Sequence, residues 1–262
     1  MSSYLEGRRY GYLTPENSGG FYKGIQHQQV AGYSVGIVYI ENINYPILPG
    51  NVVNAWTYDF PVRMKAVKGL DTPTLHSGSP KVFEEILKAA KELEKEGCRA
   101  ISAACGFFAH FQKQLADEMD IPVAISSVVQ IPWIRPLLKK GQKIGILTAN
   151  AVALDDSLFE HCGVDRGNDL VVADLRHGEQ FSAIMEDRGS FDNAGTMNEV
   201  VSAAVKLVEE NPDIGAILLE CSDMPPYAYA VQAATGRPVF DFITLIYWLQ
   251  RGVMQRPYSG WI

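Results

Sequence analysis

One stretch of the sequence decides the fold: Gly215-Ala-Ile-Leu-Leu-Glu-Cys-Ser-Asp-Met-Pro-Pro-Tyr227. An apolar run, Ala216 to Leu219, is followed by Glu220 and Cys221. The segment from Ser222 through the two prolines is typical of the beginning of a helix. We therefore expect a buried parallel strand with Cys221 at its carboxyl end. Ligands of open α/β sheets bind outside this end of the strands, and helix-start N–H groups there favour a thiolate.

The rest of the chain repeats this alternation of strand and helix, which predicts parallel sheets covered by helices on both faces. The expected strands are 34–40, 62–67, 99–104, 122–126, 143–148, 169–174, 216–220 and 238–240. A proline-interrupted piece around 131–141 is interpreted as the crossing between two lobes. We expect residues 1–130 to form the first lobe, 131–240 the second, and a C-terminal helix, 241–262, to pack back on the first.

A weak internal repeat is found when the sequence is slid along itself. Three places then coincide: Ala100-Ile101 with Ala216-Ile217, Cys105 with Cys221, and Pro122-Val123 with Pro238-Val239. The matches mark the same places in a strand, cysteine, helix, strand unit, and this predicts two similar lobes related by a pseudo-two-fold axis. Both thiols would then meet in the cleft between the lobes, where ligand pockets concentrate.

Two opposed thiols suit chemistry at the carbon next to a carboxylate. A thiolate on one face removes the α-proton, and a thiol on the other face returns one. The resulting carbanion needs hydrogen-bond donors around its carboxylate. We expect these from Gly106 and Ser222, which follow the two cysteines, and then from Thr148 and Ser127 at other predicted strand ends.

Composition limits the classes of function. The formal net charge is −7 and no basic block is present, which argues against a nucleic-acid partner or an anionic membrane surface. No apolar run is long enough to cross a bilayer, and the N-terminus lacks a signal-peptide pattern. The four cysteines show no CxxC spacing, so we expect free thiols and a cytoplasmic location, with Cys98 and Cys162 as buried apolar residues.

Three motifs resemble the aspartate/glutamate racemase superfamily: Ile217 to Tyr227, Ala104-Cys-Gly-Phe107 and Pro238-Val-Phe-Asp241. The resemblance implies two Rossmann-like lobes with parallel sheets, an active site between the lobes, and Cys105 and Cys221 as the catalytic pair. It also implies a small carboxylate substrate, no pyridoxal phosphate or other cofactor, no metal, and a homo-oligomer, either dimer or tetramer. The first reaction to expect is cofactor-independent racemisation of an amino acid of the aspartate or glutamate type.

One departure points to a different branch of the superfamily. Its amino-acid racemases commonly follow the first cysteine with Asn-Thr, which bind the substrate carboxylate, whereas this chain has Gly106 and Phe107. With Tyr45-Pro-Ile-Leu-Pro-Gly50 and Leu147-Thr-Ala-Asn150, this set is similar to the branch that includes algal dimethylsulfoniopropionate lyases. Those enzymes abstract the same α-proton, but the carbanion expels a β-leaving group, which gives dimethyl sulfide and acrylate.

The loop 41–61 is rich in aromatic residues that suit a sulfonium ligand. Tyr45, Trp56 and Tyr58 could contact such a cation by cation–π interaction. Packing of the same rings on the core or on a partner subunit is an equally good reading of this loop. We carry Tyr45 and Phe107 forward as candidate substrate-binding residues.

Two other classes fit parts of the sequence. His110 follows Cys105 by five residues, as a cysteine/histidine hydrolase would allow, but on a helix that offset directs the histidine away from the thiol. A non-enzymatic two-lobe binding protein fits the lobed organisation but gives no role to the paired thiols. The scattered histidines do not indicate a zinc site.

Overall fold

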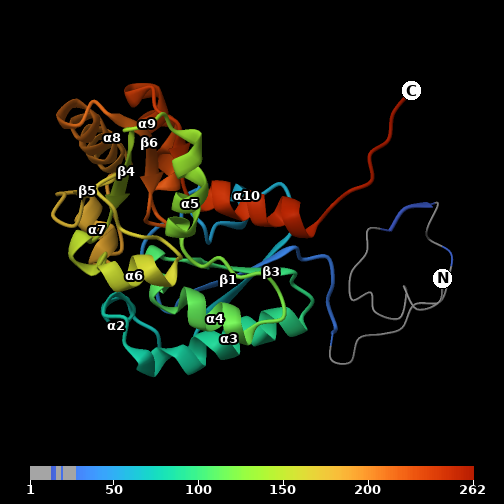
Figure 1. Cartoon of the computed structure of the whole chain (residues 1–262). Coiled ribbons are helices and arrows are strands. Elements are labelled where there is room, and N and C mark those ends of the chain that lie inside the picture. The colour runs from blue at the N-terminus through green and yellow to red at the C-terminus, as the bar shows by residue number, and fades with distance from the viewer. Residues whose placement is uncertain (1–12, 16–18, 20–27) are drawn as a thin grey trace.

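Two parallel sheets form the framework of the computed structural model, which describes residues 13–15, 19 and 28–262 (Figure 1). The first sheet has the order β2-β1-β3 and the second has the order β5-β4-β6-β7. The strands are β1 (Val35–Ile40), β2 (Val62–Val67), β3 (Ala100–Ala104), β4 (Lys143–Thr148), β5 (Leu170–Asp174), β6 (Ile214–Leu219) and β7 (Val239–Phe240). The two Rossmann-like lobes expected from the sequence are thereby confirmed.

Helices connect the strands of each sheet and cover both lobes (Figure 1). The α-helices are α2 (Thr72–His76), α3 (Phe83–Lys95), α4 (Gln112–Glu118), α5 (Ile131–Ile134), α6 (Asp156–His161), α7 (Phe181–Met185), α8 (Asn193–Glu210), α9 (Ala228–Thr235) and α10 (Phe242–Val253). Short 3-10 turns are η2 (Ala55–Thr57), η3 (Pro80–Val82), η4 (Gly106–Phe111), η5 (Ser127–Gln130), η6 (Arg135–Leu137), η7 (Ala151–Ala153) and η8 (Pro225–Tyr227).

The central strands are buried because apolar helices cover them. In α3 the residues Ile86, Ala90 and Leu93 are fully buried and form one stripe, as helical spacing requires. Leu93 packs directly over β1 at Gly36, where an added Cβ would lie 3.0 Å from the Cβ of Leu93. A side chain at this position would therefore push α3 off the sheet.

The internal repeat is present in the hydrogen bonds. The N–H of Ile101 donates to the carbonyl of Pro122 at 2.9 Å, and the N–H of Ile217 donates to the carbonyl of Pro238 at the same distance. The first lobe carries this pairing only as an isolated bridge to Val123, because the chain turns into η5 directly afterwards. The prediction of a strand over 122–126 is therefore wrong, although the symmetry that suggested it is real.

Helix α10 returns the end of the chain to the first sheet. Its Phe242 and Ile246 are fully buried in one cluster with Val35 and Ile37 of β1. The helix begins with a capping box at Asp241 and ends at Val253, before the predicted end at residue 262. Helix α10 thus lies against the first sheet, while the assignment of residues 1–130, 131–240 and 241–262 to the two lobes stays a prediction.

Ile246→Ala should test how much this returning helix stabilises the fold. The substitution leaves a cavity between α10 and β1, so we expect the free energy of unfolding to fall by about 2–5 kcal/mol in urea denaturation. Arg251→Ala changes the exposed side of the same helix and should stay within about 0.5 kcal/mol of the parent protein. Equal losses in the two variants would contradict the packing described here.

Candidate active site

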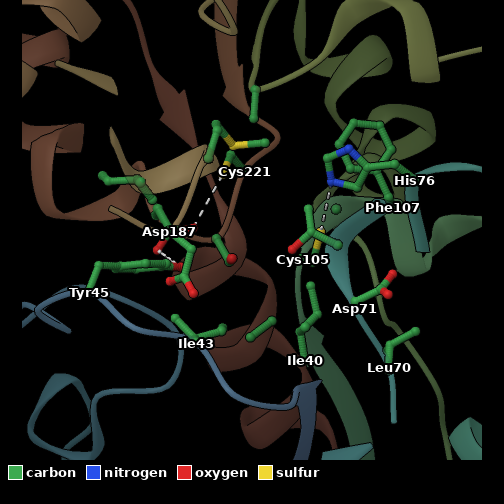
Figure 2. Close-up of a pocket in the computed structure, with 18 of the residues that line it drawn as sticks. Ile40, Ile43, Tyr45, Leu70, Asp71, His76, Cys105, Phe107, Asp187 and Cys221 are labelled. Atoms are coloured by element: carbon green, nitrogen blue, oxygen red, sulfur yellow. Dashed lines mark hydrogen bonds between the residues drawn. The ribbon is translucent and has the colours of Figure 1, made fainter. Parts of the chain in front are cut away.

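The two thiols predicted to be catalytic line one cavity of about 710 Å³ between the lobes (Figure 2). Cys105 directly follows β3 of the first lobe, and Cys221 follows the end of β6 in the second. Parallel strands place their carboxyl ends at one edge of each sheet, and here the two edges face the same cavity. Both cysteines are free thiols.

Each cysteine sulfur is buried and accepts one backbone hydrogen bond. The backbone N–H of Phe107 bonds to Cys105 and that of Asp223 bonds to Cys221, and each bond lowers the pKa of the thiol. Burial acts in the opposite direction and is the larger effect, so the pKa of both thiols lies well above the ordinary value. Both groups are therefore protonated near neutral pH, and a thiolate formed here is a strong base.

Cys221 lies beside a proton acceptor. Its Sγ is 3.6 Å from Oδ2 of Asp223, whose Oδ1 accepts hydrogen bonds from the Tyr45 hydroxyl at 3.0 Å and the Asn51 amide at 2.5 Å. Burial raises the pKa of the Asp223 carboxyl, while these donors act to lower it. Asp223 can thus receive the thiol proton of Cys221.

The loop 41–61 supplies these donors across the lobes. It is held on the second lobe at Gly50, which adopts φ +97° and would bring a Cβ to 2.8 Å from Pro226. Of its three aromatic residues predicted to contact a cation, Tyr45 lines the cavity. Trp56 is 88% exposed and Tyr58 donates to the carbonyl of Val52, so neither reaches the cavity wall.

Cys105 lies beside a histidine that the sequence reading missed. Nε2 of His76 is 3.9 Å from the Cys105 sulfur, and its ring packs on Phe107 with centroids 4.0 Å apart (Figure 2). Burial, with a smaller contribution from His110, lowers the pKa of His76 to about 4. The imidazole is therefore neutral at pH 7 and offers Cys105 a hydrogen bond without a positive charge.

Glu220 is buried where the two lobes meet. The Thr148 hydroxyl donates to its Oε2 at 2.8 Å, and no partner for Oε1 is found among the described residues. A Cβ added at Gly106 would lie 1.5 Å from this Oε1, so only a glycine fits opposite the carboxyl. Burial raises the pKa of Glu220 to about 7.

The structure brings together most of the candidates named from the sequence. The cavity is lined by Cys105, Cys221, Gly106, Phe107, Ser222 and Tyr45. Thr148 lies behind Glu220, and the Ser127 hydroxyl donates to the backbone carbonyl of Leu219. These two side chains support the end of β6 and do not reach the cavity wall.

His110 plays a different part from that of a hydrolase base. It hydrogen-bonds to the backbone of His76 and does not line the cavity with Cys105. His76, which the sequence analysis did not single out, lies on α2, a five-residue helix capped by Asp71 with Pro73 in its first turn. This Asp-Thr-Pro pattern is a helix-start signal that could have located the segment, although not the direction of the His76 side chain.

The cavity wall is strongly acidic. Its carboxyl groups belong to Glu41, Asp71, Glu186, Asp187, Glu220 and Asp223. Among the residues that the structure describes, no lysine or arginine lines it, and the one histidine that does, His76, is neutral at pH 7. Such a cavity favours a cationic group and disfavours a ligand with two carboxylates.

Neither a metal cluster nor a membrane span is found in the part of the chain that the structure describes. Histidine, cysteine and carboxylate side chains do not come together there in groups of three or more that could hold an ion. No helix within the same residues combines the length and the apolar character needed to cross a bilayer.

Solved structures share this architecture. Allantoin racemase from Pseudomonas fluorescens matches with a TM-score of 0.58 at 15% identity, covering 86% of this chain and 99% of that one. Arylmalonate decarboxylase matches with a TM-score of 0.55 at 18% identity, covering 84% and 92%. The chain thus shares its fold with these two proteins, and also with a glutamate racemase and an aspartate racemase homologue.

Sequence similarity shows the family to which the chain belongs. No family model matches the chain. A dimethylsulfoniopropionate lyase of Durusdinium sp. clade D is 33% identical over 234 residues, which cover 87% of this chain and 77% of that protein. The chain therefore belongs to the dimethylsulfoniopropionate lyase family.

Gly106→Ala tests the close contact between Gly106 of the first lobe and Glu220 of the second. The new methyl group overlaps the buried carboxyl, so we expect a loss of about 1–3 kcal/mol in the free energy of unfolding. The loss should shrink in a Glu220→Ala background, where the methyl has room. Gly252→Ala, with open space around its Cα, is the control and should not destabilise. Equal losses in both backgrounds would disprove the contact.

Glu220 should also give the protein a pH-dependent stability. The pKa of this carboxyl is about 7 in the folded state, above its ordinary value of 4.5, so the folded protein keeps a proton that the unfolded chain releases. Stability is then greatest below pH 4.5 and declines as the pH rises to 7, by up to about 3 kcal/mol for this group. Urea denaturation at pH 5 and pH 8 should show a smaller decline in Glu220→Gln. Parallel declines would show that Glu220 is not the titrating group.

Proposed function

We propose that this protein is a β-eliminating lyase that acts on dimethylsulfoniopropionate or a closely similar sulfonium carboxylate. The observation that carries the proposal is an acidic cavity around two thiols from opposite lobes, with no lysine or arginine among the described residues that line it. Membership of the lyase family supports the same reaction class.

The charge of the cavity distinguishes this substrate from an acidic amino acid. A sulfonium group is a cation, so the carboxylates of the wall attract it, and the Tyr45 ring offers a cation–π contact. Aspartate and glutamate carry two carboxylates, which proteins usually bind with arginine or lysine. Neither of these residue types lines this cavity in the described part of the chain.

Cys221 is placed to act as the base. Its thiol passes a proton to Asp223, and the thiolate then takes the α-proton of the substrate. The electron pair of the broken C–H bond forms the double bond of acrylate, and the C–S electron pair leaves with neutral dimethyl sulfide. Asp223 finally releases its proton to water, so one proton is produced in each turnover.

The first lobe would support the developing negative charge. Cys105, with its thiol proton and the neighbouring His76, lines the cavity from the other lobe. Gly106 and Ser222 also line it, and their backbones are the candidate partners for the substrate carboxylate. The Ser222 hydroxyl hydrogen-bonds to Asp223, which leaves its backbone for this role.

A racemase is the second candidate because thiols lie on two sides of one cavity. Reprotonation by Cys105 after abstraction by Cys221 would invert an α-carbon. This reaction requires that the carbanion keep its β-substituent, so a substrate without a leaving group is needed. The homo-oligomeric state expected for the superfamily is part of either proposal and is testable by light scattering.

Turnover of dimethylsulfoniopropionate tests the lyase directly. We expect dimethyl sulfide by gas chromatography and an equal amount of acrylate by proton NMR. Cys105→Ser and Cys221→Ser should each lower kcat/KM by about 100-fold or more while the protein stays folded. Cys162→Ser alters a buried thiol outside the cavity and should retain activity.

Incubation in D₂O separates the remaining outcomes. α-Deuteration and loss of optical rotation of aspartate or glutamate, without dimethyl sulfide release, would identify a racemase. Tight binding of a carboxylate that alkylation of the thiols does not change, without turnover, would identify a binding protein. Full lyase activity in Cys221→Ser would rule out the assigned base.

A further inference from the structure

We propose that His76 is a positioning residue for Cys105, and that Asn150 and Arg176 of the second lobe set its tautomer. The chain of contacts runs from Arg176 through Asn150 and His76 to the thiol of the first lobe. The inference deepens the proposed function because it concerns the thiol opposite the assigned base. Its main tests need no substrate, so they stand apart from the identity of the reaction.

The orientation of the Asn150 amide is fixed by Arg176. An arginine guanidinium only donates hydrogen bonds, so its neighbour must be an acceptor. The guanidinium of Arg176 lies 3.2 Å from Oδ1 of Asn150. Turning the amide over would place two donors against each other, and Nδ2 therefore faces away from Arg176.

The Asn150 amide in turn fixes the tautomer of His76. Nδ2 of Asn150 lies 3.3 Å from Nδ1 of the imidazole, and an amide nitrogen can only donate. Nδ1 must then be the acceptor, because a neutral imidazole carries one hydrogen, and that hydrogen sits on Nε2. Nε2–H is the atom directed at the sulfur of Cys105, 3.9 Å away.

Packing keeps the imidazole neutral and in place. Phe107 lies against one side of the ring, at 4.0 Å between centroids, and burial holds the pKa of His76 at about 4. The other groups acting on the ring are His110, itself with a lowered pKa, and the Asn150 amide. A neutral donor stabilises negative charge on Cys105 without forming the ion pair that would weaken it as an acid or base.

The contacts join the lobes at the catalytic centre. His76 ends α2 of the first lobe, whereas Asn150 and Arg176 directly follow the strand ends of β4 and β5. All three residues also line a second cavity of about 830 Å³. The guanidinium of Arg176 also donates to Nε2 of His177, at 3.3 and 3.2 Å.

Nitrogen NMR of the histidines tests the tautomer. The chain has five histidines, so ¹⁵N-labelled histidine gives few signals, and His76→Gln identifies the signal of interest. We expect Nε2–H for His76 at pH 7 in the parent protein. In Asn150→Asp the carboxylate accepts a hydrogen bond, so the signal should change to a protonated Nδ1. A protonated Nδ1 in the parent protein, or no change in the variant, would overturn the proposal.

Alkylation of Cys105 tests the consequence for the thiol. In His76→Leu, which removes the donor, the pH midpoint of iodoacetamide reaction at Cys105 should rise, as followed by peptide mass spectrometry. His76→Gln restores an N–H and should bring the midpoint back toward that of the parent protein. The midpoint for Cys221 is the internal reference and should not move. A midpoint for Cys105 that is the same in all three proteins would also overturn the proposal.

Turnover distinguishes positioning from a purely structural role. His76→Leu should lower kcat by about 10- to 100-fold with KM nearly unchanged, and His76→Gln should recover part of the loss. His161→Gln changes an exposed histidine of α6 and should leave activity unaltered. Parallel losses in the leucine and glutamine variants would indicate that His76 only packs, and would contradict the proposal.

Discussion

The close approach of the Glu220 carboxyl to the Cα of Gly106 sets the distance between the two lobes. Each of these residues is the chain neighbour of a cavity thiol, so the contact also decides how Cys105 and Cys221 face each other. A larger residue at position 106 would widen the cleft at its deepest point. Because the carboxyl is buried there, its pKa rises to about 7, so it is charged in only about half of the molecules in neutral solution.

Burial around this contact makes the thiolates of Cys105 and Cys221 strong bases. Desolvation raises the pKa of both thiols, and each receives one backbone N–H in compensation. The lobes then differ in what they add: the second gives Cys221 a carboxylate, and the first gives Cys105 a neutral imidazole. A symmetric duplication of strand and thiol thus becomes an asymmetric site, which suits an elimination that needs a single base.

Local patterns in the sequence were sufficient to predict the parallel lobes and the two thiols. Apolar strands that end at cysteines, and the repeat that pairs Ile101 with Ile217, depend on short-range rules that the structure follows. The contacts of Asp223 with Tyr45 and Asn51 could not be predicted, because they join residues far apart in the chain. His76 escaped notice since a five-residue helix has almost no periodicity, and only the folded chain brings its ring to Cys105.

The second cavity is a site at which a small molecule could disturb Cys105 without contacting its thiol. It shares Thr72, Pro73, His76, Met185 and Glu186 with the catalytic cavity, and it is also lined by Arg176, which is not among the described residues around the catalytic cavity. An anionic compound that pairs with this guanidinium would draw it from Asn150 and so disturb the imidazole beside Cys105. Inhibition would then depend on the hydrogen bonds of His76 and not on contact with either thiol.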